Sequence, residues 1–155
     1  MKNIFSIMLI AVLGLTVAFT SCKEEEHETE PLPTAVIQGT VKAQLDLNNT
    51  NPENVPNGTK LIFRIDSRDL VQSPIAGHEY KVLQYEVTVQ DGAYSMTVPS
   101  AVFAAVNVDI VPVDFQYDQV QTDNSKIEKT YLGGVTAVAT QADEVYFVNL
   151  TYNAI

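Results

Sequence analysis

From Thr34 onward, apolar and polar residues alternate with a period of two in one segment after another. This pattern is typical of β-strands that bury one face and expose the other. The alternating segments cover residues 34–47, 59–66, 82–90, 94–99, 106–117, 129–139 and 143–153. No pattern of normal helix length accompanies them, so we expect an all-β fold, an antiparallel β-sandwich of about seven strands.

Turn-forming residues predict the connections between these segments. Asp91-Gly92 lies between two alternating runs, and both central positions of a tight hairpin turn need positive φ. We therefore expect residues 82–90 and 94–99 to pair as an antiparallel hairpin. We also expect a short edge strand at 69–72, a helical turn at 100–105 and a polar loop at 118–128. Pro112 is expected to mark a bend or a sheet edge, and Gly133-Gly134 a bulge or a close backbone approach.

The first 33 residues have a different composition. Residues 1–21 carry a positive charge at Lys2 followed by a long apolar run, which is the layout of a signal peptide. A transmembrane helix is the alternative, but an acidic block follows the apolar run, and basic flanks rather than acidic ones set membrane topology. The expected organisation is a signal peptide at 1–21, an anchored acidic tether at 22–33 and a β-sandwich domain at 34–155.

Cys22 is the only cysteine, and small residues precede it. Phe19-Thr20-Ser21-Cys22 resembles a relaxed bacterial lipobox of the Bacteroidota, which implies that Cys22 is acylated. Several acyl chains would hold the protein firmly to a membrane. The tract that follows resembles a signal for export to the outer face of the outer membrane, and it consists of Lys23, Glu24, Glu25 and Glu26. The resemblance implies an outer-membrane lipoprotein that faces outward at the cell surface.

The charge balance limits the kinds of partner. The chain has nine Lys plus Arg against nineteen Asp plus Glu, and its formal net charge is −10. Nucleic-acid phosphates require a basic surface, so we expect no nucleic-acid partner.

Three segments carry a family likeness. The first is Ile37-Gln38-Gly39-Thr40-Val41, which has a glycine inside a strand. The second runs from Val55 to Phe63 and contains a Pro-x-Gly turn, and the third runs from Val89 to Pro99 and contains a Gly-x-aromatic hairpin. Together they resemble the carboxypeptidase regulatory-like, or transthyretin-like, β-sandwich. The resemblance implies an immunoglobulin-like or transthyretin-like fold with a non-catalytic, accessory role.

The inventory of reactive side chains is poor. Outside the tether, which contains His27, the only histidine is His78, and no cysteine remains. A Ser-His-Asp site would need His78 with an unidentified serine, and zinc sites of His and Cys cannot be assembled. We predict no enzyme activity, no catalytic residue, no cofactor and no metal.

Loop carboxylates are the one arrangement that leaves a metal alternative open. Asp66 and Asp69 share one loop, and four further aspartates follow one strand and its loop, at Asp109, Asp114, Asp118 and Asp123. Calcium takes six to eight oxygen ligands, so calcium binding stays as an alternative, although no spacing matches a calcium loop.

Aromatic side chains are the best candidates for a binding surface. The chain has no tryptophan, so a sugar platform would have to use tyrosine or phenylalanine, such as Tyr80 or Tyr131. Phe115 and Tyr117 lie beyond Pro112 and beside a polar loop, and we expect this pair to be the least buried. An exposed pair there would mark a partner surface, for a glycan or for an envelope or host protein.

These observations favour a non-enzymatic, lipid-anchored envelope protein that serves as a binding or assembly module. The first alternative is a structural subunit of a pilus or adhesin, joined by strand addition at an open sheet edge. The second is a calcium-binding or glycan-binding accessory domain.

Overall fold

Strands account for most of residues 31–155, which are the residues that the computed structural model describes. The predicted signal peptide, Cys22 and the tract from Lys23 to Glu26 lie outside the described residues. Eleven strands and one 3-10 helix are present in the described part. They are β1 Thr34–Ala43, β2 Glu53–Asn54, β3 Lys60–Asp66, the 3-10 helix η1 Ser67–Leu70, β4 Val82–Thr88, β5 Ala93–Pro99, β6 Val106–Pro112, β7 Phe115–Val120, β8 Lys126–Gly133, β9 Thr136–Thr140, β10 Val145–Phe147 and β11 Leu150–Ala154.

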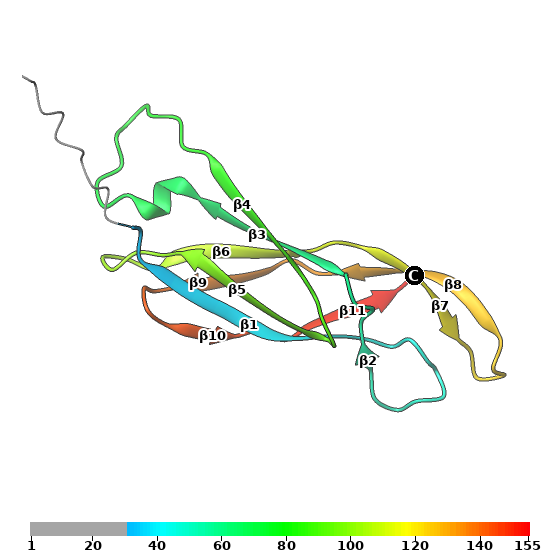
Figure 1. Cartoon of the computed structure of the whole chain (residues 1–155). Helices are drawn as coiled ribbons and strands as arrows, with labels where there is room; N and C mark the ends of the chain where they lie inside the picture. The colour runs from blue at the N-terminus through cyan, green and yellow to red at the C-terminus, as the bar shows by residue number, and fades with distance from the viewer. Residues whose placement is uncertain (1–30) are drawn as a thin grey trace, which may run out of the picture. The chain divides into compact units, whose positions relative to one another are not determined.

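The strands form two sheets (Figure 1). One has seven strands in the order β10-β1-β11-β8-β7, with β2 and β5 also paired to β1. The other has four strands in the order β4-β3-β6-β9. Every pairing is antiparallel except those of β1 with β10 and with β11, which are parallel. The predicted all-β sandwich is confirmed, and the parallel pairs around β1 are its one departure from an antiparallel design.

The core lies between the two sheets and follows the predicted alternation. In β3, Leu61, Phe63 and Ile65 are fully buried, and the residues between them face outward. Val106, Val108 and Ile110 of β6 repeat this pattern. From the opposite sheet, Tyr94 brings its ring to 6.0 Å from that of Phe63. Burial of these apolar side chains is the main favourable term that holds the sheets together.

At Asp91-Gly92 the predicted tight turn is confirmed, but the predicted pairing of the strands on either side is not. Asp91 and Gly92 have φ of 50° and 74°, and Gln90 and Ala93 exchange backbone hydrogen bonds of 3.0 and 2.8 Å, as in a tight two-residue turn. The predicted pairing of the flanking strands is wrong, because β4 pairs with β3 and β5 pairs with β1 in the other sheet. Turn residues set the local chain reversal, but the partner of each strand is chosen by residues far away in the sequence.

Three segments that were each predicted as one strand form two strands in the structure. The segment 106–117 becomes β6 and β7, which lie in different sheets on either side of a bend after Pro112. The segment 129–139 becomes β8 and β9, and the chain crosses between sheets at Gly133-Gly134. A Cβ on Gly133 would collide with the side chain of Pro112, which confirms the predicted close backbone approach.

The last segment, 143–153, becomes β10 and β11, and both pair in parallel with β1. Between them the Val148 carbonyl group crosses directly over Gly39, where any Cβ would collide with it. The Thr40 amide then donates to the Asn149 side-chain oxygen (3.0 Å) instead of to a backbone carbonyl. Gly39 therefore permits the break in the edge of the sheet that separates β10 from β11.

Three connections differ from their predictions. The expected edge strand at 69–72 is absent, and the 3-10 helix η1 starts there after Asp66, whose carboxylate accepts from the Arg68 amide (2.9 Å). Residues 100–105 bend without forming a helical turn. The expected loop 118–128 is shorter, because β7 continues to Val120 and β8 begins at Lys126. In each case tertiary pairing or a side-chain cap overrides local composition.

Candidate functional site

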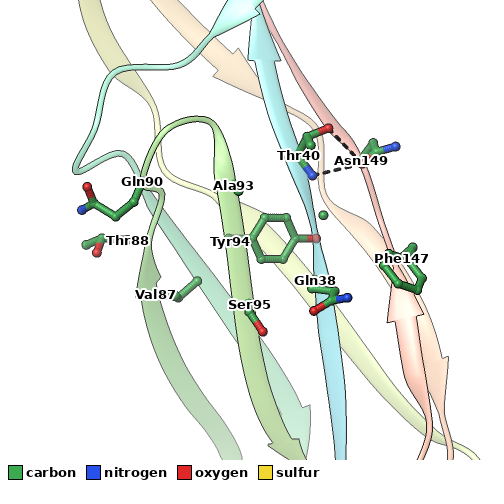
Figure 2. Close-up of a pocket in the computed structure, with 11 residues that line it drawn as sticks. Gln38, Thr40, Val87, Thr88, Gln90, Ala93, Tyr94, Ser95, Phe147 and Asn149 are labelled. Carbon is green, nitrogen blue, oxygen red and sulfur yellow. Dashed lines mark hydrogen bonds between the residues drawn. The ribbon is translucent and has the colours of Figure 1, made fainter.

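The first candidate site is a hollow of about 640 Å³ beside strands β1, β4, β5 and β10 (Figure 2). We call it the Phe147 hollow. It is lined by Gln38, Gly39, Thr40, Val87, Thr88, Gln90, Ala93, Tyr94, Ser95, Phe147 and Asn149. The strand register explains why these residues lie together, because Gln38 of β1 lies opposite Ser95 of β5 on one side and opposite Phe147 of β10 on the other.

Hydrogen bonds hold the Phe147 hollow in shape. The Thr40 amide and hydroxyl both donate to the Asn149 side-chain oxygen, at 3.0 and 2.9 Å, as drawn in Figure 2. The Tyr94 hydroxyl donates to the Val148 carbonyl (2.8 Å). Burial raises the pKa of Tyr94 to about 12, so this phenol keeps its proton at any physiological pH. All three bonds tie the segment between β10 and β11 to the rest of the sheet.

The chemistry of the Phe147 hollow is uncharged and largely apolar. None of its eleven described lining residues is acidic or basic. Phe147 is 76% exposed, the highest exposed fraction among the aromatic residues of the described part. The hollow therefore combines a large exposed ring with uncharged apolar, hydroxyl and amide groups.

The second candidate site is a hollow of about 650 Å³ between the loop after β1 and the edge strand β7. We call it the Tyr117 hollow. It is lined by Lys42, Leu45, Asp46, Asn49, Glu53, Asn54, Tyr117 and Val120. The loop is held against β7 because Leu47 donates from its amide to the Val120 carbonyl, and Val120 donates back to Leu45, each at 2.9 Å.

Glu53 is the best-ordered polar group of the Tyr117 hollow. The Leu45 amide donates to its Oε2 (2.8 Å), and the Asn49 side-chain amide donates to its Oε1. Burial by itself raises the pKa of Glu53, but these hydrogen bonds to the charged form lower it below its usual value overall. Glu53 is therefore an ionised and fixed acceptor at neutral pH.

The structure separates the two residues predicted as a partner surface. Phe115 is half-buried and its ring stacks on Tyr131, with centroids 4.9 Å apart and planes 2° from parallel. Its edge also meets Tyr152 at 5.0 Å, and both tyrosines are buried in the core. Tyr117, two residues along β7, is 41% exposed and lines the second hollow. Only Tyr117 of this pair therefore offers an exposed ring.

The candidate calcium ligands come together only in part. Asp66, Asp69 and Asp109 line a smaller hollow of about 330 Å³, but they share it with the cationic Arg64. Asp123 instead accepts from the Ser125 amide and hydroxyl, and these bonds lower the pKa of Asp123. Within residues 31–155, no group of three or more acidic, histidine or cysteine side chains is arranged to hold a metal ion.

His78 lies in the exposed connection between η1 and β4. Its ring meets the Tyr80 ring edge-on at 4.6 Å, and the Tyr80 hydroxyl accepts from the Ile75 amide (2.9 Å). This packing gives His78 an ordinary loop environment. The buried Tyr131 donates from its hydroxyl to the Gln44 carbonyl (2.9 Å), so it serves the core rather than a sugar platform.

Sequence reasoning missed Phe147 and the partners of Tyr117. Phe147 occupies an outward position in the alternation of the last segment, opposite in phase to Tyr146 and Val148, and an apolar residue on that face is a usable signal. Asp46 and Glu53 gave no such signal, because their approach to β7 depends on the path of a loop.

The described residues include no helix with the length and apolar content needed to cross a membrane. Comparisons with known proteins return little. No family model matches the chain, and no curated protein matches it. Among solved structures, the chain is similar to the shaft pilin SpaA from Lactobacillus rhamnosus GG, with a TM-score of 0.42 and 8% identity. That match covers 80% of this chain and 52% of the pilin chain, so this chain spans about half of the pilin's length.

Proposed function

We propose that this chain is a non-enzymatic, lipid-anchored protein of the outer membrane, exposed at the cell surface, that binds another envelope protein through the Phe147 hollow. The anchoring part rests on Cys22 and on the tract from Lys23 to Glu26. The binding part rests on the structure of the sandwich.

A single observation carries the binding part. The chain has 28 charged residues, nine basic and nineteen acidic, yet none lines the Phe147 hollow. The centres of protein interfaces are depleted in charged residues and enriched in aromatic ones. A charged ligand would find no ion pair there, whereas an apolar side chain of a partner would be buried against Val87, Ala93 and Phe147.

The geometry adds a second reason. The hollow is held by the bonds from Thr40 to Asn149 and from Tyr94 to Val148, all within the sheet. A surface that is already ordered before binding loses less conformational entropy when a partner docks. A partner that docks here would bury the Phe147 ring, and buried aromatic anchors dominate the energy of most interfaces.

The binding part is tested by placing a charge in the hollow. Phe147→Glu should release the chain from its native envelope complex, because a carboxylate would be desolvated there without a partner. Val145→Glu is the matched control, since Val145 is also exposed on β10 but does not line the hollow. Native gel electrophoresis of gently solubilised envelopes measures the complex. A Phe147→Glu chain that still migrates with the complex would reject the proposal.

The anchor is tested separately. Cys22→Ala should move the chain from the membrane fraction to the soluble fraction of the envelope, because the acyl chains hold it there. Retention of the Cys22→Ala chain in the membrane fraction would contradict the lipid anchor while leaving the hollow untested by that experiment.

A structural subunit is the second candidate, and the exposed sheet edges support it. In the described part, β5 and β10 each pair with β1 alone, so each has a free edge that a strand from another copy could extend. Such a subunit would form ladders of oligomers after removal of Cys22. A monomer at high concentration in light scattering would remove this candidate.

A further inference from the structure

We propose that the Tyr117 hollow is a binding site for a neutral oligosaccharide. This inference goes beyond the proposed protein contact at the Phe147 hollow, and it rests on a different set of residues. Its volume of about 650 Å³ falls within the range of roughly 300–1,000 Å³ that is usual for small-ligand sites.

The apolar part of a sugar would meet Tyr117. A pyranose ring presents a face of C–H groups, and an aromatic ring offers a flat and partly apolar surface that can cover it. Tyr117 is 41% exposed on the edge strand β7, whereas its neighbour Phe115 is stacked against the core. The exposed ring is thus fixed at the wall of the hollow by a strand that packs through Phe115.

The hydroxyl groups of a sugar would meet the polar side chains that line the same hollow. Both Glu53 oxygens are held by hydrogen bonds, and each keeps a further lone pair for a hydroxyl donor. Asp46 uses one oxygen to accept from the Asn48 amide (2.8 Å), which fixes the second carboxylate. Lys42 also lines the hollow and adds a donor, so the site offers both acceptors and donors.

A neighbouring hollow also uses Tyr117. A second hollow of about 380 Å³ shares Tyr117 and is also lined by Gln116, Asp118, Lys126 and Glu128. Amide, carboxylate and ammonium groups are again combined with the same aromatic residue. A ligand with repeating hydroxyl groups could therefore contact both hollows, which favours an oligosaccharide over a single sugar.

The charge of the two hollows disfavours an acidic sugar. Two carboxylates and one lysine line each of the two hollows, so each carries one excess negative charge. The formal net charge of the whole chain, which includes these groups, is also negative, at −10. A uronic acid or a sulfated sugar would be repelled by both fields.

Titration calorimetry tests the proposal with the full chain in a detergent that lacks a sugar headgroup. The probes are neutral hexasaccharides of glucose, mannose, galactose and xylose, with a hexamer of galacturonic acid and a hexamer of lysine for comparison. We expect at least one neutral hexasaccharide to bind, and the galacturonic acid hexamer to bind at least tenfold more weakly. Affinity weaker than about 1 mM for every neutral probe, or tighter binding of the lysine hexamer, would overturn the proposal.

Variants locate the site. Tyr117→Ala should weaken binding of the neutral probe about tenfold, Tyr117→Phe should preserve most of it, and Glu53→Gln should weaken it several-fold. Phe147→Ala should leave the affinity unchanged, which separates this proposal from the protein contact. Unchanged affinity in Tyr117→Ala would contradict the site, and thermal unfolding of each variant shows that the comparison is made between folded chains.

Discussion

The Phe147 hollow and the Tyr117 hollow have nearly equal volumes, about 640 and 650 Å³, but opposite chemistry. The first has no charged side chain among its described lining residues, and the second combines Lys42, Asp46 and Glu53 with one aromatic ring. Size alone therefore says little about what each site can bind. The difference in charge is the basis on which we propose an apolar protein surface as the ligand of one and a hydroxyl-rich ligand for the other.

The two hollows also differ in how they are built. Paired strands and a break in the sheet edge form the first, so its shape depends on the backbone contact between Gly39 and Val148 as well as on the hydrogen bonds of Asn149 and Tyr94. A loop that bridges to an edge strand forms the second, so its shape depends on side-chain hydrogen bonds such as those of Glu53. We expect changes in packing to have their largest effect on the first hollow, and we expect the loss of polar contacts to affect both.

Gly39→Ala should have the largest effect and should act on the Phe147 hollow. The new Cβ would collide with the Val148 carbonyl, and overpacking against backbone costs about 1–3 kcal/mol or more. Gly134→Ala is the matched control, because no atom lies within 4 Å of a Cβ built there. Chemical denaturation measures both. Equal stability of the two variants would contradict the close approach of β1 and the Val148 segment.

Phe115→Ala should have the next largest effect and should separate Phe115 from Tyr117. It removes the stacking on Tyr131 and the edge contact to Tyr152, and the half-buried site should cost about 2 kcal/mol. Tyr117→Ala should cost less than about 0.5 kcal/mol, since exposed substitutions rarely matter for stability. Denaturant midpoints check this. A larger loss for Tyr117→Ala would mean that Tyr117 belongs to the core.

Asn149→Ala should have an intermediate effect of about 1 kcal/mol. It leaves the Thr40 amide and hydroxyl without their shared acceptor, and both groups are solvent-accessible, so water can replace part of the loss. Amide hydrogen exchange should become faster at Thr40 and stay unchanged at Leu45 in the other hollow. Unchanged exchange at Thr40 would show that Asn149 does not close the sheet break.

A pH titration should give the smallest effect and should distinguish the two hollows. The pKa of Glu53 is lower in the folded chain than its usual value of 4.5, so its contribution is present above pH 4.5 and is lost as the pH falls through the folded pKa. Glu53→Gln should therefore flatten the acid side of the stability profile. Tyr94 has a pKa raised to about 12, so the Phe147 hollow should not respond in this range. A profile unchanged by Glu53→Gln would contradict the assignment.

The sequence predicts those features of the fold that depend on neighbouring residues. The alternation correctly identifies Leu61, Phe63 and Ile65 as inward residues, and Asp91-Gly92 correctly marks a tight turn. The pairing of β4 with β3 and of β5 with β1 depends on contacts between distant segments, so the hairpin prediction fails there. The splitting of 143–153 likewise depends on Gly39, more than a hundred residues earlier in the chain.

The candidate sites are less predictable than the fold. Tyr117 is identifiable from the sequence because it follows a proline and precedes a polar stretch. The same reasoning groups it with Phe115, whose half-buried ring stacks on Tyr131 across the β7–β8 pairing. Asp46 and Glu53 meet Tyr117 only because a loop folds back onto β7. Phe147 could be found from the sequence only by examining the outward, mostly polar face of the last segment, where this one aromatic residue breaks the alternation.

Photo-cross-linking in intact cells tests the division between the two hollows most directly. A photoreactive amino acid is placed at position 147 in one chain and at position 117 in another, and adducts are identified by mass spectrometry. The account predicts a discrete adduct with one envelope protein from position 147 and no such adduct from position 117. The adduct from position 147 should be lost when Ala93, which lines the Phe147 hollow, is replaced by Glu. The same protein captured from both positions, or from position 117 alone, would contradict it.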